Sequence, residues 1–78
     1  MINEKKLNKL ITKRKSKYRD NIEFINDIYS RGLNKHGCMI LELLLLNKDY
    51  DSIMRTLLFT TKSFEILIDQ IYVFLKTK

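Results

Sequence analysis

The feature that most restricts the fold of this chain is its lack of residues that break regular structure. The 78 residues contain no proline and only two glycines, Gly32 and Gly37. A sheet of several strands needs turns, and turns draw heavily on glycine and proline. We therefore expect an all-α chain, and a chain of this length forms one domain at most.

Apolar residues recur at helical spacing through the first thirty residues. Asn3 is suited to cap the start of this segment, and Gly32 to end it. The apolar stripe thins out across Lys13–Lys15. The pattern is therefore compatible with one long helix over residues 4–30, or with two helices that break near Thr12–Ser16. The periodic apolar positions are Leu7, Leu10, Ile11, Tyr18, Ile22, Ile25, Ile28 and Tyr29.

Residues 33–78 are predicted to form three further helices joined by two short turns. Asn34 is suited to cap the first, which should run to about Leu46. Apolar residues cover nearly all faces of that helix, so it should lie at the centre of the core. Asp49 is suited to cap a short second helix, and Thr60 the last one. An inward stripe on the last helix is formed by Phe64, Ile68, Ile71 and Leu75.

A set of core positions in this second half follows the spacing of a known family. They are Leu33-Asn34-Lys35, Ile40-Leu41-Glu42-Leu43-Leu44, Ile53, Leu57, Thr60, Phe64, Ile71-Tyr72 and Leu75. In this spacing the chain resembles the helix-turn-helix of the LuxR/GerE transcription regulators and, more distantly, region 4 of sigma factors. The resemblance divides the chain into a basic N-terminal helical segment, 1–32, and a helix-turn-helix unit, 33–78, packed as a single domain.

The positions at which this family contacts DNA differ here. His36 and Gly37 replace the Arg-Glu pair of the family's opening. The base-facing positions hold Glu65, Ile66 and Asp69, and carboxylates repel phosphates, although they can accept a hydrogen bond from cytosine. No counterpart of the family's dimerising fourth helix is expected. The phosphate-facing start of the third helix keeps suitable residues: Thr61, Lys62 and Ser63.

The excess positive charge is confined to the first quarter of the chain. The formal net charge is +6, and residues 1–20 carry eight basic and two acidic side chains, whereas the rest of the chain is balanced. Such a segment suits the phosphates of double-stranded DNA, with Tyr18 available for stacking or packing. A solvated face, a partly disordered tail and an anionic membrane surface are the alternatives, the last disfavoured because the apolar side lacks Trp and Phe. The expected DNA-binding residues are Lys6, Lys9, Lys13, Arg14, Lys15, Lys17 and Arg19.

The last helix carries more apolar residues than one inward stripe requires. A second set beside the stripe indicates a second covered face. The N-terminal helix could cover it within the monomer, or it could meet a second copy or another protein. A homodimer would also support a core that is small for independent folding. The residues of this expected partner or dimer interface are Ile66, Leu67, Val73 and Phe74.

Catalytic chemistry is poorly represented. The single histidine, His36, and the single cysteine, Cys38, would lie on different faces of a helix. No metal-ligand spacing, glycine-rich phosphate loop or catalytic triad is present, so we expect no catalytic residues, no metal, no cofactor and no enzymatic activity. The apolar run Met39–Leu46 is too short to span a membrane. A lone cysteine favours a reducing compartment, and we expect a cytoplasmic protein.

Two functions follow from these patterns. The first is a small helix-turn-helix DNA-binding protein, a transcription regulator whose basic N-terminal segment contacts phosphates. The second is a helix-turn-helix-derived module that binds a protein of the transcription machinery, as an inhibitor or adaptor of a transcription factor or polymerase encoded by a phage or mobile element. In the second, the acidic and apolar last helix would be the docking face.

Overall fold

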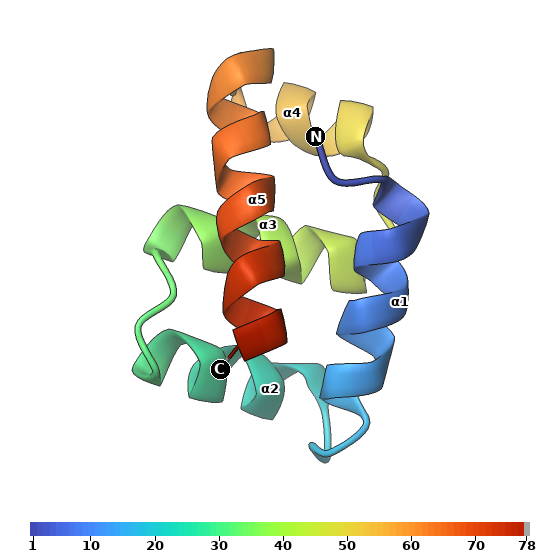
Figure 1. Ribbon diagram of the computed structural model, residues 1–78, viewed down its shortest axis with the longest axis vertical. Coiled ribbons are helices and arrows are strands. Elements are labelled where there is room, and N and C mark those ends of the chain that lie inside the picture. Colours follow the sequence, from blue (N-terminus) through green and yellow to red (C-terminus); the bar gives the residue numbers. More distant parts are fainter. Residues whose placement is uncertain (78) are drawn as a thin grey trace.

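The computed structural model of the protein describes residues 1–77 and places them in five α-helices (Figure 1). Residues 1–77 contain no strand, so the expected all-α class is confirmed. Within these residues no helix combines the length and the apolar content that crossing a membrane requires. The helices are α1 (Glu4–Lys15), α2 (Asn21–Ser30), α3 (Lys35–Leu45), α4 (Tyr50–Leu57) and α5 (Thr61–Thr77).

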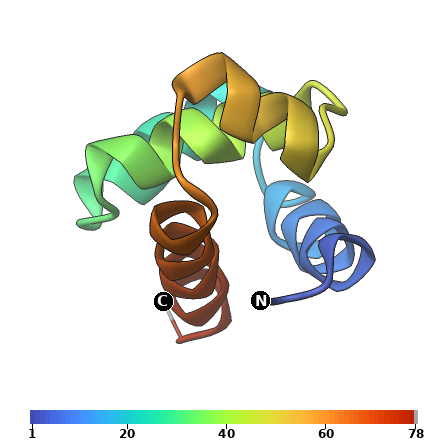
Figure 2. The same cartoon turned by 90° about the horizontal axis from the view of Figure 1, so that it is seen from above.

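The helices form two layers with the core between them. α1 and α5 stand side by side in the same direction, and α2 and α3 lie across them (Figure 1). Seen from above, α2, α3 and α4 make up the second layer (Figure 2). α1 packs against α5, and α3 packs against both α2 and α5. Every helix contributes to the core, whose fully buried large side chains are Leu7, Phe24, Ile28, Ile40, Leu41, Ile53, Phe64, Ile68, Ile71 and Leu75.

The basic N-terminal segment forms two helices. α1 continues past Thr12 to Lys15, and the break falls over residues 16–20, later than the sequence pattern indicates. Local polar contacts fix it there. The Ser16 hydroxyl donates to a carbonyl of the last turn of α1, and the Asp20 carboxylate accepts a 2.8 Å hydrogen bond from the Glu23 amide at the start of α2. A polar turn therefore ends the basic run.

The four capping residues predicted from the sequence are confirmed. In each case a side-chain oxygen accepts from backbone amides in the first turn, which otherwise lack a partner inside the helix. The accepting residues are Asn3 (from Lys5, 2.8 Å), Asn34 (from His36, 2.7 Å), Asp49 (from Ser52, 2.8 Å) and Thr60 (from Ser63, 3.1 Å).

Three helices end in the same way, and one of them does so with an unusual residue. One of the two residues that follow each helix adopts a left-handed conformation, with φ of 112° at Gly32, 64° at Asn47 and 58° at Leu58. In each, the next amide bonds to a carbonyl five residues back, as in a Schellman motif. Glycine and asparagine tolerate this backbone, whereas leucine does so poorly. Leu58 is also 88% exposed, so packing does not explain its presence.

The predicted inward stripe of α5 is confirmed, because all four of its residues are buried. The expectation for α3 holds on one side only: Ile40, Leu41 and Leu44 are buried, but Leu46 at its end is 59% exposed. The second apolar set of α5 is not covered by α1. Ile66 and Val73 are 51% and 57% exposed, whereas Leu67 and Phe74 are half-buried against the core. Ile66 and Val73 are therefore the uncovered part of the second apolar set of α5.

Candidate nucleic-acid interface

The lysines of α1 that point towards α5 are set by the helical repeat. Leu7 and Ile11 anchor α1 in the core. Lys6, Lys9 and Lys13 follow one another at steps of three and four, so they form a row along the flank of the helix. All three are exposed. Because α1 packs against α5, this row of lysines borders α5.

The row forms one wall of a groove between α1 and α5. The groove has a volume of about 240 Å³, and α5 contributes Tyr72 and Lys76 to it. Four of the described side chains that line it are cationic and none is acidic. Four ammonium groups without a carboxylate repel one another, so an anion in the groove would be favoured. The lining residues are Lys6, Lys9, Leu10, Lys13, Tyr72 and Lys76.

Tyr72 holds two of the ammonium groups in place. The Nζ atoms of Lys6 and Lys76 lie 5.5 and 5.3 Å from the centre of its ring, within cation–π range. Lys76 also donates a 3.5 Å hydrogen bond to the Tyr72 hydroxyl. Desolvation raises the pKa of Tyr72, but the hydrogen bond from Lys76 and the charges of both lysines outweigh it and lower the pKa from its usual 10.0. The local potential is therefore positive.

The opposite end of the α1–α5 seam is acidic. Glu4 accepts a 2.8 Å hydrogen bond from the backbone amide of Tyr50, and Glu65 lies 3.6 Å from the N-terminal ammonium of Met1. Desolvation, followed by the charges of Glu4 and Asp69, raises the pKa of Tyr50 to about 12. The carboxylates near the start of both helices therefore make that end of the seam less favourable to an anion than the Tyr72 half.

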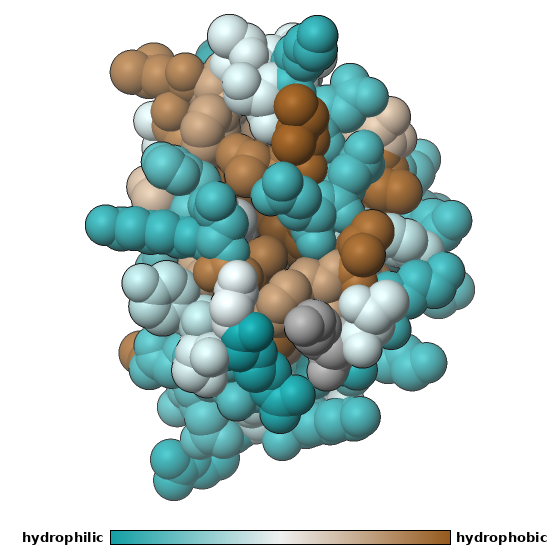
Figure 3. Space-filling model, turned by 60° about the vertical axis from the view of Figure 1, so that its left-hand side comes forward, coloured by the Kyte–Doolittle hydropathy of each residue, from teal (hydrophilic) through white to brown (hydrophobic). Residues whose placement is uncertain are grey.

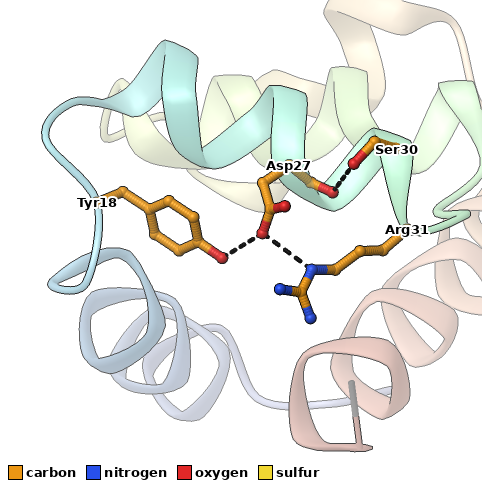
Figure 4. A network of polar contacts seen from close by, with 4 residues as sticks. All are labelled: Tyr18, Asp27, Ser30 and Arg31. Carbon is orange, nitrogen blue, oxygen red and sulfur yellow. Dashed lines mark hydrogen bonds and ion pairs between the residues drawn. The ribbon is translucent and has the colours of Figure 1, made fainter.

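Tyr18 packs and does not present its ring for stacking. Its ring lies 5.1 Å from that of Phe24, and its hydroxyl donates a 2.5 Å hydrogen bond to Asp27 (Figure 4). Arg31 donates to the same carboxylate oxygen at 2.9 Å, and Ser30 donates to the Asp27 carbonyl. The Asp27 hydrogen bond raises the pKa of Tyr18, and the same bond lowers the pKa of Asp27. This network ties the α1–α2 connection to α2.

The other basic residues predicted to bind DNA point in several directions. Arg14 and Lys15 are half-buried, and Lys15 borders a hollow beside the end of α3, on the flank away from α5. Lys17 and Arg19 lie in the α1–α2 connection. Arg19 donates to Glu23 at 3.1 Å, which neutralises part of its charge. The basic segment is therefore not one continuous binding face.

The start of α5 lies far from the groove. Thr61, Lys62 and Ser63 are exposed, but fifteen residues separate Thr61 from Lys76, which is about 22 Å along the helix axis. The start of α5 and the lysines of the groove could therefore not bind neighbouring phosphates of one strand.

The sequence alone did not indicate Tyr72 and Lys76 as site residues. Their spacing of four residues on α5 was a usable signal, but only the packing of α5 against α1 reveals what they border.

Across residues 1–77, no three His, Cys, Asp or Glu side chains converge in a way that could hold a metal ion. Cys38 is buried, and desolvation raises the pKa of its thiol, which disfavours the reactive thiolate. His36 is exposed and meets the ring of Phe59 edge-on at 5.9 Å between ring centres.

Comparison of the chain with protein-family models, with curated proteins and with solved structures gives no match. Function is therefore inferred from the geometry, charge and exposed side chains of the protein itself. The LuxR/GerE resemblance stays a prediction.

Proposed function

We propose that this protein binds double-stranded DNA through the α1–α5 groove, as a small cytoplasmic regulator of transcription. One observation carries the proposal: four lysines line a single groove in which no described residue is acidic. Neutralised phosphates release counterions, and this release drives protein–DNA association.

The length of the lysine row suits a nucleic-acid backbone. Lys6 and Lys13 are seven residues apart, which is about 10 Å along α1. A strand of B-DNA carries one phosphate for about every 3.4 Å of its axis. The four lysines of both walls can therefore contact about four successive phosphates of a strand that runs along the groove.

Within this proposal the helix-turn-helix resemblance gives α5 a positioning role. Thr61, Lys62 and Ser63 at its exposed N-terminal turn are suited to a second phosphate contact. Glu65 and Asp69 are unsuited to one. The groove supplies affinity, and any choice of sequence depends on contacts outside it.

Fluorescence anisotropy with a labelled duplex at several salt concentrations tests the proposal. Four phosphates neutralised by four lysines give a slope of log K against log salt of about −3.6. Affinity should then fall about 150-fold between 50 and 200 mM salt. A slope near zero, or no duplex binding at low salt, would refute DNA binding.

A matched pair of triple variants separates the groove from net charge. Lys6→Ala, Lys9→Ala and Lys13→Ala together should reduce the slope by about 2.7, because three phosphate contacts are lost. The control removes the same charge outside the groove, and it should alter the slope much less. Equal losses in both variants would mean that general attraction, not the groove, binds DNA. The control residues are Lys5, Lys35 and Lys48, all exposed.

A protein-binding module is the second candidate. The exposure of Ile66 and Val73 on α5 favours it, because apolar side chains contribute nothing to phosphate binding. Under this function Val73→Glu should abolish capture of a protein of the transcription machinery while the groove variants retain it. The same captured proteins with wild type and Val73→Glu would exclude it.

A further inference from the structure

A second hollow lies on the other flank of α1, away from the lysine groove. It has a volume of about 110 Å³ and lies where α1 meets the end of α3. The polar side chains of Asn8, Thr12, Lys15 and Asn47 line it, and none of its described lining residues is acidic. Within residues 1–77 these four side chains make no hydrogen bond or ion pair. Their donor groups are therefore available to a ligand.

The chemistry of this hollow favours an anion. Lys15 contributes a cation, and Thr12 and the two asparagine amides contribute neutral donors. The carbonyl oxygens of Leu43 and Leu44 at the end of α3 already accept from amides of the following turn, at 3.1 and 3.0 Å, which reduces the negative potential of that helix end. Phosphate oxygens are strong acceptors for such a set of donors, so the hollow is suited to one phosphate group.

The helical repeat places the hollow and the lysine groove at two sides of one exposed face of α1. Asn8, Thr12 and Lys15 follow one another at steps of four and three, so they form a second row beside the lysine row. The two rows lie about a third of a turn apart around the helix axis. α1 has no acidic residue after Glu4, and no other helix of residues 1–77 lies over this face (Figure 2).

A helix with phosphate-binding groups on two sides has the dimensions of the DNA major groove. An α-helix with its side chains is about 10–12 Å across, and the major groove is about 12 Å wide, whereas the minor groove is only about 6 Å wide. A strand held in the α1–α5 groove would border α1 along the lysine row. The opposite strand of the same major groove would then border the second row, where the hollow can receive one of its phosphates.

The outer side of α5 offers no comparable surface. Its exposed residues include Asp69, which repels phosphates, and Ile66 and Val73, which contribute nothing to phosphate binding. Apolar side chains gather on the side of the molecule that is turned away from α1 (Figure 3). A duplex is therefore favoured on the α1 side.

We infer that α1, and not α5, enters the major groove, with the lysine row on one strand and the second row on the other. Thr12 is the member of the second row nearest to the lysine row, so its exposed side chain faces the base edges, which threonine can contact. The inference rests on the proposed binding of double-stranded DNA, and it adds which helix enters the duplex and which groove it occupies.

Duplexes and ligands that occupy one groove only test the choice of groove. A duplex whose major groove carries bulky groups, such as glucosylated hydroxymethylcytosine, should bind at least about tenfold more weakly than the unmodified duplex. Netropsin occupies the minor groove, and it should not displace the protein. Fluorescence anisotropy measures both effects with the full chain.

Substitutions in the second row test the contact with the opposite strand. The lysine groove alone gives a slope of log K against log salt of about −3.6, and a fifth contact from Lys15 makes it about −4.5. Lys15→Ala should remove about 0.9 of that slope, whereas Lys15→Arg, which keeps the charge, should not.

A carboxylate on the outer face of α1 tests which helix faces the DNA. Thr12→Glu should weaken duplex binding at least about tenfold, because the carboxylate would lie against bases and phosphates. Thr56→Glu is the matched control: it makes the same change of charge at an exposed position of α4, and it should bind like the wild type.

The outcomes separate this inference from the proposed function. A wild type that binds no duplex at low salt would refute DNA binding itself. Suppose instead that the duplex is bound and that the variants of the lysine row lose it. Displacement by netropsin, full binding to the glucosylated duplex, an unchanged slope with Lys15→Ala, or equal effects of Thr12→Glu and Thr56→Glu would then each overturn only the placement of α1 in the major groove.

Discussion

The left-handed backbone of Leu58 gives a stability prediction with an unusual sign. Replacing a large apolar residue by glycine normally destabilises a protein. Here Leu58→Gly should stabilise the fold, because glycine adopts φ 58° without the clash that a side chain causes. Unfolding is measured at two protein concentrations, because an unfolding free energy that does not change with concentration contains no contribution from self-association.

The magnitude follows from three contributions. Relief of a left-handed non-glycine residue contributes about 1–2 kcal/mol. The greater backbone freedom of glycine in the unfolded chain offsets about 0.5–1 kcal/mol of this. Loss of the side chain costs little, because Leu58 is 88% exposed. The net gain is about 0.5–1 kcal/mol, which corresponds to a rise in Tm of about 2–8 °C for a domain of this size.

Urea unfolding followed by circular dichroism measures this difference, with Leu46→Gly as the control. Leu46 is also an exposed leucine at the end of a helix, but its φ is −89°, so glycine offers it no relief. Leu46→Gly should therefore lower the unfolding free energy by about 0.5–1 kcal/mol. Equal destabilisation by both variants would show that the Leu58 backbone is not strained in solution.

Three other predictions concern the tyrosines. Tyr50→Phe should remove a part-buried hydrogen bond and lower the unfolding free energy by about 1 kcal/mol. Because folding raises the pKa of Tyr50 from 10.0 to about 12, wild-type stability should fall as pH rises between these values, and urea unfolding of Tyr50→Phe should show less of that fall. Tyr18→Phe should raise the pKa of Asp27, observed by NMR titration of its carboxyl, because the Tyr18 hydrogen bond is the main cause of its lowered value. Lys76→Ala should raise the pKa of Tyr72 in an absorbance titration of phenolate, and an unchanged value would show that the two side chains are not in contact in solution.

Local chemistry in the sequence was sufficient for much of the fold. Asn34, Asp49 and Thr60 cap helices because a short polar side chain must satisfy the first backbone amides, and that requirement depends only on near neighbours. The buried stripe of α5 follows in the same way from the helical repeat. Both kinds of prediction use interactions within a few residues.

What the sequence did not reveal depends on contacts between distant residues. Lys6 and Tyr72 are far apart in the chain, and no periodic pattern indicates that α1 packs along α5 in the same direction. The conformation of Leu58 was hidden for a different reason: a leucine gives no sign of a left-handed backbone. The sequence identified the basic residues of the N-terminal segment. Only the structure shows that Lys6, Lys9 and Lys13 line the groove and that the other basic residues of this segment lie outside it.

The groove is built from the first and the last helix of the chain, which has a thermodynamic consequence. Its two walls come together only when the intervening helices are folded, so the unfolded chain has no such site. A ligand held there stabilises the whole native state, by about 2.7 kcal/mol at a hundred times its dissociation constant. Binding should therefore slow hydrogen exchange in α2 and α3, which do not line the groove, wherever that exchange requires global unfolding. Occupancy of one surface groove is then reported by amides throughout the core.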